Sequence, residues 1–267
     1  MTESMNISAE LVYPLAPALP CSMAQFLASP QAGAPLILSD LDGCLISGAT
    51  VLPDVPELVE RAGARLWVVS NNSADTALSL HDRLRGVGLN IAPERILLAG
   101  EYALRDLARR WPGAEVALWA APPLVELARD LGLRPHRGAR AAPIALLARD
   151  PDFSLRDLER LMRLAHGGTQ VILANPDPIH PAADGTPVPE TGALYAALQA
   201  GLPGLRAHSD GKPSDVMIRR ALRQSGIVAG QAVFLGDTDA TDGMAARAAG
   251  VPFVLLRRPG TPDKEKI

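Results

Sequence analysis

The feature that most constrains this chain of 267 residues is its alternation of short apolar runs with amphipathic stretches. A short apolar run bounded by turn residues is typical of a buried strand, and apolar residues at helical spacing indicate a helix. Strands that alternate with helices form βαβ units, in which mostly parallel strands lie between two layers of helices. The sequence therefore predicts an α/β fold with a doubly wound, Rossmann-like sheet. The expected strands are residues 36–40, 65–70, 116–120, 143–148, 170–174, 232–236 and 252–257, and the expected helices are residues 56–63, 75–87, 100–110, 122–131, 154–166, 191–200, 213–225 and 239–249.

Residues 1–34 do not show this alternation. The segment is rich in proline and alanine and has no clear period, which is typical of irregular structure. We expect a loosely structured N-terminal arm that carries one short helix near Ser22–Ala28.

Composition and charge narrow the classes of ligand and compartment. Hydrophobic residues make up 48% and charged residues 21% of the chain, close to the average for a globular protein. The net charge of -3 provides no field that would attract nucleic acid or acidic lipid. No apolar run approaches the roughly 18 residues of a spanning helix, and the first residues lack the basic start of a signal peptide. We therefore expect a cytoplasmic protein that binds a small molecule, with no nucleic acid and no membrane as partner.

Acidic residues follow two of the expected strands. Asp40 ends one apolar run and Asp42 comes two residues later, so both side chains can face the same pocket. Alone, this pattern is as often a turn cap as a site, but Asp237 and Asp242 follow another expected strand. Crowded carboxylates need a cation, and oxygen ligands without histidine or cysteine favour Mg²⁺. The sequence therefore predicts a magnesium site.

Two further groups could bind an anion. Ser70 and Asn72 follow a strand and offer donors at the expected start of a helix, although this pattern is also common in an ordinary N-cap. Lys212 is one of only three lysines in a chain that otherwise uses arginine. A compact ammonium can reach a phosphate oxygen and a carboxylate together, whereas the alternative is a lysine exposed on the surface by chance.

Four short motifs in register resemble those of the haloacid dehalogenase-like superfamily: DLDGCL, SNN, GKP and GDTDATDG. The long insertion after the second motif contains LANPDPIHP at 173–181 and GALYAALQAG at 192–201. It resembles subfamily IIA, which includes p-nitrophenyl phosphatases, ribonucleotide monophosphatases and pyridoxal phosphate phosphatases. The resemblance covers about residues 35 to 257. It implies a catalytic core formed by residues 1–111 and 204–267 and an inserted α/β cap formed by residues 112–203.

The resemblance implies roles for the four acidic residues. Asp40 would be the nucleophile that forms an aspartyl phosphate, and Asp42 the general acid and base. Mg²⁺ would be held by the carboxylate of Asp40, the backbone carbonyl of Asp42 and Asp237. Asp242 would orient a water molecule on the metal, or Lys212.

The resemblance also implies a set of substrate-binding residues. Ser70, Asn71, Asn72 and Lys212 would bind the oxygens of the phosphoryl group. His180 would contact the substrate from the cap, although a histidine exposed on a loop is an equal alternative. A homodimer formed through the cap is common among the relatives and is left open here.

Together these features predict a Mg²⁺-dependent phosphatase that acts on a small phosphorylated metabolite. One alternative is a non-catalytic protein of the same fold that binds a phosphometabolite, but such a protein should have lost Asp40, Asp42, Lys212 or Asp237. Another is a Rossmann-type dinucleotide binder, which needs a glycine-rich turn that the first strand does not supply. Which phosphate monoester is the substrate, what the N-terminal arm does and which oligomer forms cannot be predicted from the sequence.

Overall fold

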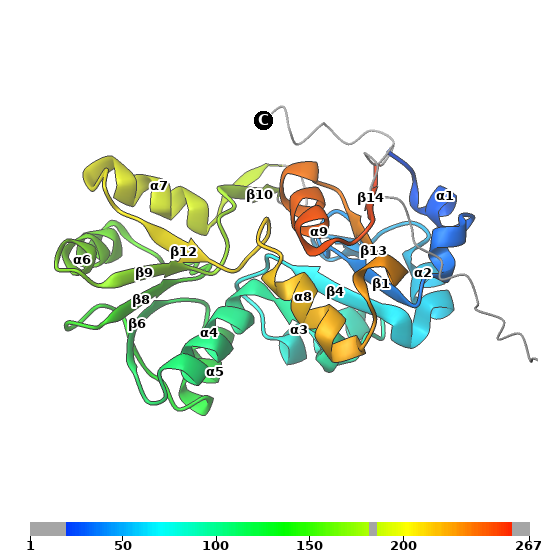
Figure 1. The fold of residues 1–267 in the computed structure, drawn as a ribbon. Coiled ribbons are helices and arrows are strands. Elements are labelled where there is room, and N and C mark those ends of the chain that lie inside the picture. Colours follow the sequence, from blue (N-terminus) through cyan, green and yellow to red (C-terminus); the bar gives the residue numbers. More distant parts are fainter. Residues whose placement is uncertain (1–19, 182–185, 258–267) are drawn as a thin grey trace, which may run out of the picture.

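The computed structural model describes residues 20–181 and 186–257 and forms two lobes (Figure 1). The first lobe is built around a parallel sheet of β1 (Leu36–Ser39), β4 (Leu66–Ser70), β5 (Ile96–Leu98), β13 (Ala232–Gly236) and β14 (Phe253–Leu255). Its strand order is β14-β13-β1-β4-β5, so β1 is central.

Both faces of the first sheet are covered by helices. Successive side chains of a strand point to opposite faces, so Ile37 of β1 packs into one hydrophobic cluster while Leu36 and Leu38 pack into the other. The first cluster includes residues of α1 (Met23–Leu27), α2 (Val55–Ala62) and α3 (Ala77–Gly86), and the second includes residues of α8 (Val216–Ser225) and α9 (Met244–Ala249). The predicted doubly wound α/β core is therefore confirmed.

Residues 20–34 of the expected arm belong to this core. Ser22 caps α1 through a capping box with Gln25, and Phe26 is buried in the first cluster. The predicted short helix is present, but this part of the arm is packed rather than loosely structured. Residues 1–19 of the expected arm lie outside the described residues.

The second lobe contains a second parallel sheet, inserted between β5 and β13 along the chain. The sheet consists of β6 (Glu115–Trp119), β7 (Arg134–His136), β8 (Ile144–Leu147), β9 (Gln170–Leu173) and β12 (Ala207–Ser209), in the order β12-β9-β8-β6-β7. One face is covered by α5 (Pro122–Asp130) and part of α4 (Ala99–Arg110), and the other by α6 (Leu155–His166) and α7 (Thr191–Gly201) (Figure 1). The predicted insertion of a second α/β unit is confirmed.

Two elements connect the lobes. α4 packs Ala99 into the second cluster of the first lobe and Leu104 and Leu107 into the second lobe. β12 lies beyond residue 203, where we expected the cap to end, so the chain leaves the second sheet only after Ser209. The return to the first lobe therefore runs directly from β12 to α8.

Several short elements do not appear among the predicted ones. The three-residue strands β5, β7 and β12 are too short to show a period. Two antiparallel hairpins pair β2 (Ile46–Ser47) with β3 (Thr50–Val51), and β10 (Ile179–Pro181) with β11 (Pro187–Pro189). α9 begins at Met244 rather than at 239, because residues 239–243 form a π-helical turn.

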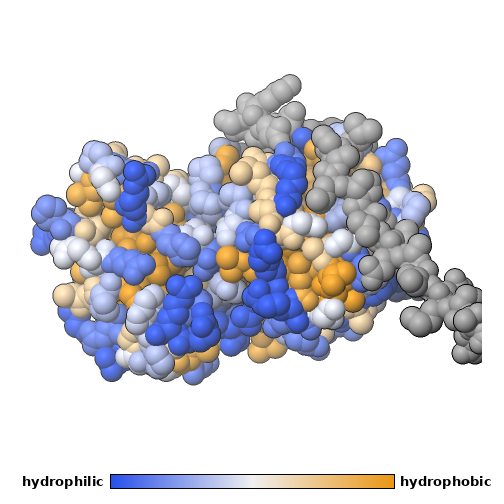
Figure 2. All heavy atoms as spheres, viewed as in Figure 1, coloured by the Kyte–Doolittle hydropathy of each residue, from blue (hydrophilic) through white to orange (hydrophobic). Residues whose placement is uncertain are grey.

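Polar and charged residues cover much of the face shown in Figure 2, interspersed with smaller hydrophobic areas. Across residues 20–181 and 186–257, no helix has both the length and the apolar character needed to cross a bilayer.

Candidate active site

Three loops of the first sheet meet at one edge because β1 lies between β13 and β4. Ser39 at the end of β1 pairs with Leu235 of β13 and with Val68 of β4. The loops that follow these parallel strands leave the sheet at its carboxyl edge, where open α/β sheets bind ligands. This register brings Asp40 close to Asp237, as the strand-end argument predicts.

Lys212 is buried between two carboxylates. Its Nζ lies 2.7 Å from Oδ1 of Asp40 and 2.6 Å from Oδ1 of Asp242, and its side chain is only 2% exposed. Burial alone would lower the pKa of Lys212, but Asp242 and Asp40 outweigh burial and raise the pKa, so the ammonium stays charged. The structure thus contradicts the alternative of a surface lysine. Lys212 follows β12, an edge strand of the second sheet, so it reaches the carboxyl edge of the first sheet from the segment that connects the two lobes.

The loop after β13 holds Asp242 in place. Its Oδ2 accepts hydrogen bonds from the backbone N–H groups of Asp237 and Thr238, both at 3.2 Å. A Cβ at Gly236 would lie 2.4 Å from the Cβ of Asp242, so this close approach requires glycine. Both oxygens of Asp242 are therefore engaged by the protein, one by Lys212 and the other by the loop.

The charges around Lys212 fit a divalent cation. Asp40, Asp237 and Asp242 gather near one ammonium, which leaves an excess of negative charge. Asp42 lies in the loop after β1, where its backbone forms a bridge with Ile46, and it is partly exposed. The oxygen donors of Asp40 and Asp237 are ligands that Mg²⁺ prefers.

Cys44 of the DLDGCL motif borders the same space. Its Sγ and carboxylate oxygens of Asp40 and Asp237 all lie within 4.8 Å of one another. Burial, and then the charges of Asp237 and Asp40, raise the pKa of the Cys44 thiol well above its usual range. A protonated thiol is a poor ligand, so the donor set remains one of hard oxygens.

The motif of Ser70 and Asn72 has two possible roles from its sequence, anion binding and capping, and the two side chains differ in which role they fit. Oγ of the buried Ser70 accepts a hydrogen bond of 3.1 Å from the backbone N–H of Asn72, which leaves the hydroxyl hydrogen of Ser70 free to donate. The side chain of Asn72 caps the following turn, because its Oδ1 accepts from the N–H groups of Ala74 at 3.0 Å and Asp75 at 2.9 Å. The alternative of a local cap therefore describes the Asn72 side chain, although α3 itself has its N-cap at Thr76.

Asn71 connects three segments of the chain. Its Oδ1 accepts a hydrogen bond of 2.7 Å from the backbone N–H of Lys212, and its Nδ2 donates to the backbone oxygen of Lys212 at 2.9 Å. The same Nδ2 donates to Oδ2 of Asp177 in the second lobe at 2.9 Å.

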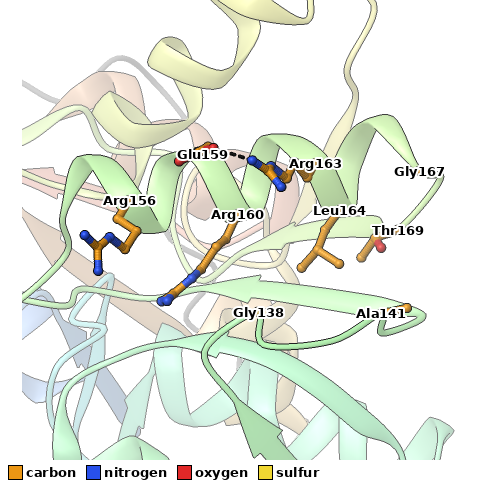
Figure 3. Close-up of a pocket in the computed structure, with 9 residues that line it drawn as sticks. All are labelled: Gly138, Ala141, Arg156, Glu159, Arg160, Arg163, Leu164, Gly167 and Thr169. Carbon is orange, nitrogen blue, oxygen red and sulfur yellow. Dashed lines mark hydrogen bonds and ion pairs between the residues drawn. The ribbon is translucent and has the colours of Figure 1, made fainter.

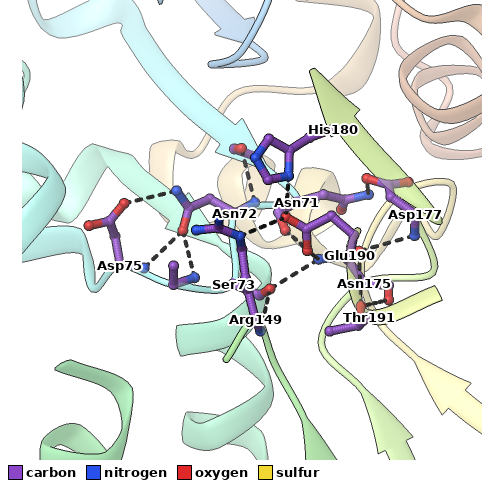
Figure 4. A network of polar contacts seen from close by, with 12 residues as sticks. Asn71, Asn72, Ser73, Asp75, Arg149, Asn175, Asp177, His180, Glu190 and Thr191 are labelled. Carbon is purple, nitrogen blue, oxygen red and sulfur yellow. Dashed lines mark hydrogen bonds and ion pairs between the residues drawn. The ribbon is translucent and has the colours of Figure 1, made fainter. Parts of the chain in front are cut away.

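A polar network extends from this loop into the second lobe (Figure 4). His180 of β10 is about one-third exposed, and its Nδ1 lies 2.8 Å from Oε1 of Glu190. The buried Asn175 donates to the backbone oxygen of Asn71 at 2.8 Å and to Oγ of Ser73 at 3.1 Å. The sequence analysis did not single out Asn175 or Glu190. The position of Asn175 just after an expected strand is the signal that could have found it.

A separate hollow of about 460 Å³ lies on the second lobe beside α6 (Figure 3). Its lining residues are Gly138, Ala141, Arg156, Glu159, Arg160, Arg163, Leu164, Gly167 and Thr169. None of the predicted site residues lines it, so the hollow is distinct from the edge where Asp40 and Lys212 meet.

Comparison with known proteins agrees with this geometry. The family model described as Haloacid dehalogenase-like hydrolase matches residues 37–134, and a second HAD-hydrolase-like model matches residues 209–266. Chronophin from Homo sapiens is 32% identical over 237 residues, which cover 82% of this chain and 79% of chronophin. This chain belongs to the haloacid dehalogenase-like hydrolases.

Two solved structures extend the comparison. The p-nitrophenyl phosphatase from Archaeoglobus fulgidus has a TM-score of 0.77 and 30% identity, with 88% of this chain and 90% of that chain covered. The glycerol phosphate phosphatase from Mycobacterium tuberculosis, solved in complex with magnesium, has a TM-score of 0.75 and 26% identity, with 88% and 69% covered. These likenesses place the chain in subfamily IIA, as the motifs predict, and among the phosphoric monoester hydrolases.

Proposed function

We propose that this hydrolase is a Mg²⁺-dependent phosphatase that cleaves small phosphate monoesters through an aspartyl phosphate on Asp40. The observation that carries the proposal is the buried Lys212 ammonium, within 2.7 Å of Asp40 Oδ1 and 2.6 Å of Asp242 Oδ1. Such an arrangement orients one carboxylate as a nucleophile and supplies positive charge where a phosphoryl group would accumulate negative charge.

In the first half of the reaction, the phosphoryl group binds to the Ser70 hydroxyl, the Lys212 ammonium and the backbone around Asn71 and Asn72. A carboxylate oxygen of Asp40 attacks phosphorus, and the bond from phosphorus to the ester oxygen breaks. The carboxyl group of Asp42 gives its proton to the departing oxygen, so the alcohol leaves in its neutral form.

In the second half, water attacks the phosphorus of the aspartyl phosphate. Asp42, now a carboxylate, takes a proton from this water, and the bond between phosphorus and Asp40 breaks. Phosphate leaves, and Asp40 is again a carboxylate held by Lys212. Because Asp242 uses both oxygens within the protein, its role is to hold Lys212 and the loop after β13.

Mg²⁺ would be held by the carboxylates of Asp40 and Asp237 and by the backbone carbonyl of Asp42. When bound, the ion supplies positive charge that reduces the repulsion between these carboxylates and the phosphoryl group. The excess of acidic groups around one lysine supports this assignment.

The second lobe would act as the cap that reads the rest of the substrate. His180 approaches the site from β10, with its Nδ1 2.8 Å from Oε1 of Glu190. A glycerol phosphate phosphatase among the relatives supports a small phosphorylated metabolite as substrate. Dimerisation through the cap stays a prediction.

A panel of small phosphate monoesters, including p-nitrophenyl phosphate, tests the proposal with Mg²⁺ and with EDTA. We expect turnover only with Mg²⁺, and none in Asp40→Asn, whose amide has nearly the same shape but is a poor nucleophile. Turnover that persists in EDTA would contradict the metal assignment. Binding of the esters without hydrolysis by the wild type would instead support the non-catalytic alternative.

A further inference from the structure

The side chain of Asn71 has no free donor for a phosphoryl oxygen. An asparagine amide nitrogen carries two hydrogens. In Asn71, one points to the backbone oxygen of Lys212 and the other to Oδ2 of Asp177, both at 2.9 Å. Figure 4 shows Asn71 close to Asp177. Only acceptor capacity remains on this side chain, and acceptors repel phosphate.

The same side chain fixes the backbone of the catalytic lysine from both sides. The N–H of Lys212 donates to Asn71 Oδ1 at 2.7 Å, while the carbonyl of Lys212 accepts from Asn71 Nδ2. This double contact needs close approach, because a Cβ at Gly211 would lie 2.9 Å from Asn71 Oδ1. The reach of the Lys212 ammonium to Asp40 therefore starts from a backbone that Asn71 holds in place.

The cap holds Asn71 through two residues. Asp177 accepts from its side chain, and the buried Asn175 donates to its backbone oxygen at 2.8 Å. Any change in the position of these cap residues would therefore be passed to Lys212 through Asn71.

We propose that the side chain of Asn71 is a positioning residue that places Lys212 and links it to the cap through Asp177, and that it does not bind the phosphoryl group. The inference rests on the proposed function for the meaning of Lys212. It revises the implied role of Asn71, which would contact phosphate only through its backbone.

Swapping the residue types at positions 71 and 177 distinguishes a positioning role of Asn71 from a phosphate-binding role. Asn71→Asp keeps the acceptor for the Lys212 N–H but places a carboxylate opposite Asp177. We expect it to lower kcat/KM for p-nitrophenyl phosphate by about a hundredfold, the scale of a small misplacement in an active site. Adding Asp177→Asn restores a donor between the two positions and should recover about tenfold, measured against Asp177→Asn alone in a double-mutant cycle.

A phosphate-binding role predicts the opposite, because a carboxylate at position 71 repels phosphate whatever lies at position 177. If the double variant is no more active than the additive expectation, the proposal is wrong. Asn71→Ala gives a second readout: we expect kcat to fall at least tenfold with KM changed by less than threefold. A rise of KM equal to the fall of kcat would overturn the proposal.

The exposed Asn90, outside the site, serves as the matched control. Asn90→Ala should leave both constants unchanged. A wild type and an Asn90→Ala variant that both lack turnover would contradict the proposed function rather than the role of Asn71. Urea unfolding of wild type, Asn71→Asp, Asp177→Asn and the double variant tests the contact between Asn71 and Asp177 without measuring turnover. Non-additive changes in the free energy of unfolding support this contact, and additive changes contradict it.

Discussion

The Lys212 ammonium lies between two carboxylates in a space that excludes solvent, so its shape matters as much as its charge. Arginine keeps the charge but replaces a compact group with a planar fork. We predict that Lys212→Arg lowers kcat/KM about as strongly as Lys212→Met, by roughly a hundredfold. Steady-state kinetics of both variants on p-nitrophenyl phosphate measure this.

Arg156→Lys on the exposed face of α6 is a suitable control, because the residue is far from the predicted site residues and should be silent. If Lys212→Arg instead retains more than about a third of wild-type kcat/KM, the loss of transition-state stabilisation is below about 0.7 kcal/mol. In that case the exact position of the ammonium is not what activity requires. The phosphoryl group would then need another cation.

Cys44 is close to Asp40 yet shielded from solvent by its surroundings. Its side chain is almost fully buried, and burial with nearby carboxylates raises the pKa of the thiol. We predict that iodoacetamide near pH 8 leaves Cys44 unmodified in the native protein and labels it after unfolding in urea. Mass spectrometry of the two samples decides this, and fast native labelling of Cys44 would contradict the buried, protonated thiol.

At the scale of residues, the sequence could predict which site residues meet only where they follow parallel strands of one sheet. Asp40 and Asp237 were expected to meet because each follows a strand, and parallel strands end at one edge. The bonds of Asn71 and the position of Asn175 could not be predicted in this way, because they depend on how a loop of the second lobe docks on the first. That docking brings together residues about a hundred positions apart, which no local pattern encodes.

At the scale of elements, the turn between β13 and α9 depends on one glycine. A Cβ at Gly236 would overlap Asp242, so we predict that Gly236→Ala lowers the free energy of unfolding by about 1–3 kcal/mol. It should also lower kcat, because Asp242 holds Lys212. Urea unfolding and kinetics test both.

Gly204 provides the control for this substitution, since nothing lies within 4 Å of a Cβ built there. Gly204→Ala should change stability by no more than about 0.5 kcal/mol. Equal effects of the two substitutions would show that the close contact at Gly236 is not what constrains the turn.

The start of α6 predicts an acid-sensitive contribution to stability. Burial alone would raise the pKa of Asp157, but hydrogen bonds from Ser154 and Arg137 outweigh it and hold the pKa well below its ordinary value of 3.8. A carboxylate with a lowered pKa stabilises the fold above its unfolded pKa, and the contribution is lost as pH falls towards its folded pKa. We expect Asp157→Asn to cost about 1–3 kcal/mol near neutral pH.

Urea unfolding of wild type and Asp157→Asn at pH 7, 5, 4 and 3 measures this contribution. The gap between the two proteins should be constant from pH 7 to 5 and should narrow below about pH 4, because the carboxyl group of Asp157 takes up a proton in the unfolded wild type there while the folded wild type still holds a carboxylate, and asparagine has no such group. A gap that does not change with pH would contradict the ionic origin.

At the scale of elements, the longer strands with buried apolar runs were predicted more accurately than the short ones. β4 and β8 are within a residue or two of the expected strands because each lies in an apolar run of at least four residues. β7 and β12, at the edges of the second sheet, have only three residues each, and they pair through backbone contacts that side-chain periodicity does not reveal. The π-helical turn at 239–243 replaces the first turn of an expected helix, because Asp242 must reach back to the loop after β13.

At the scale of the whole molecule, metal binding should appear as a change in global stability. A ligand that binds only the folded state stabilises it by about 2.7 kcal/mol at a hundredfold excess over its Kd. We predict that Mg²⁺ raises the midpoint of thermal unfolding of the wild type, and that Asp237→Asn removes most of this shift. Calorimetry with Mg²⁺ or with EDTA tests this, and an equal shift in both proteins would place the ion elsewhere.

Because the second lobe is inserted into the chain of the first, the two lobes can fold at different times during synthesis. Every strand of the second sheet, and each helix that covers it, lies between Ala99 and Ser209 in one continuous stretch. The first sheet cannot close around β1 until Ala232–Gly236 has left the ribosome. Because domains generally form as units while the chain grows, we expect the second lobe to form first, while Asp40 lies beside an incomplete sheet until Lys212 and the loop after β13 have followed. The second lobe would therefore be complete before Asp40, Lys212 and Asp242 can come together.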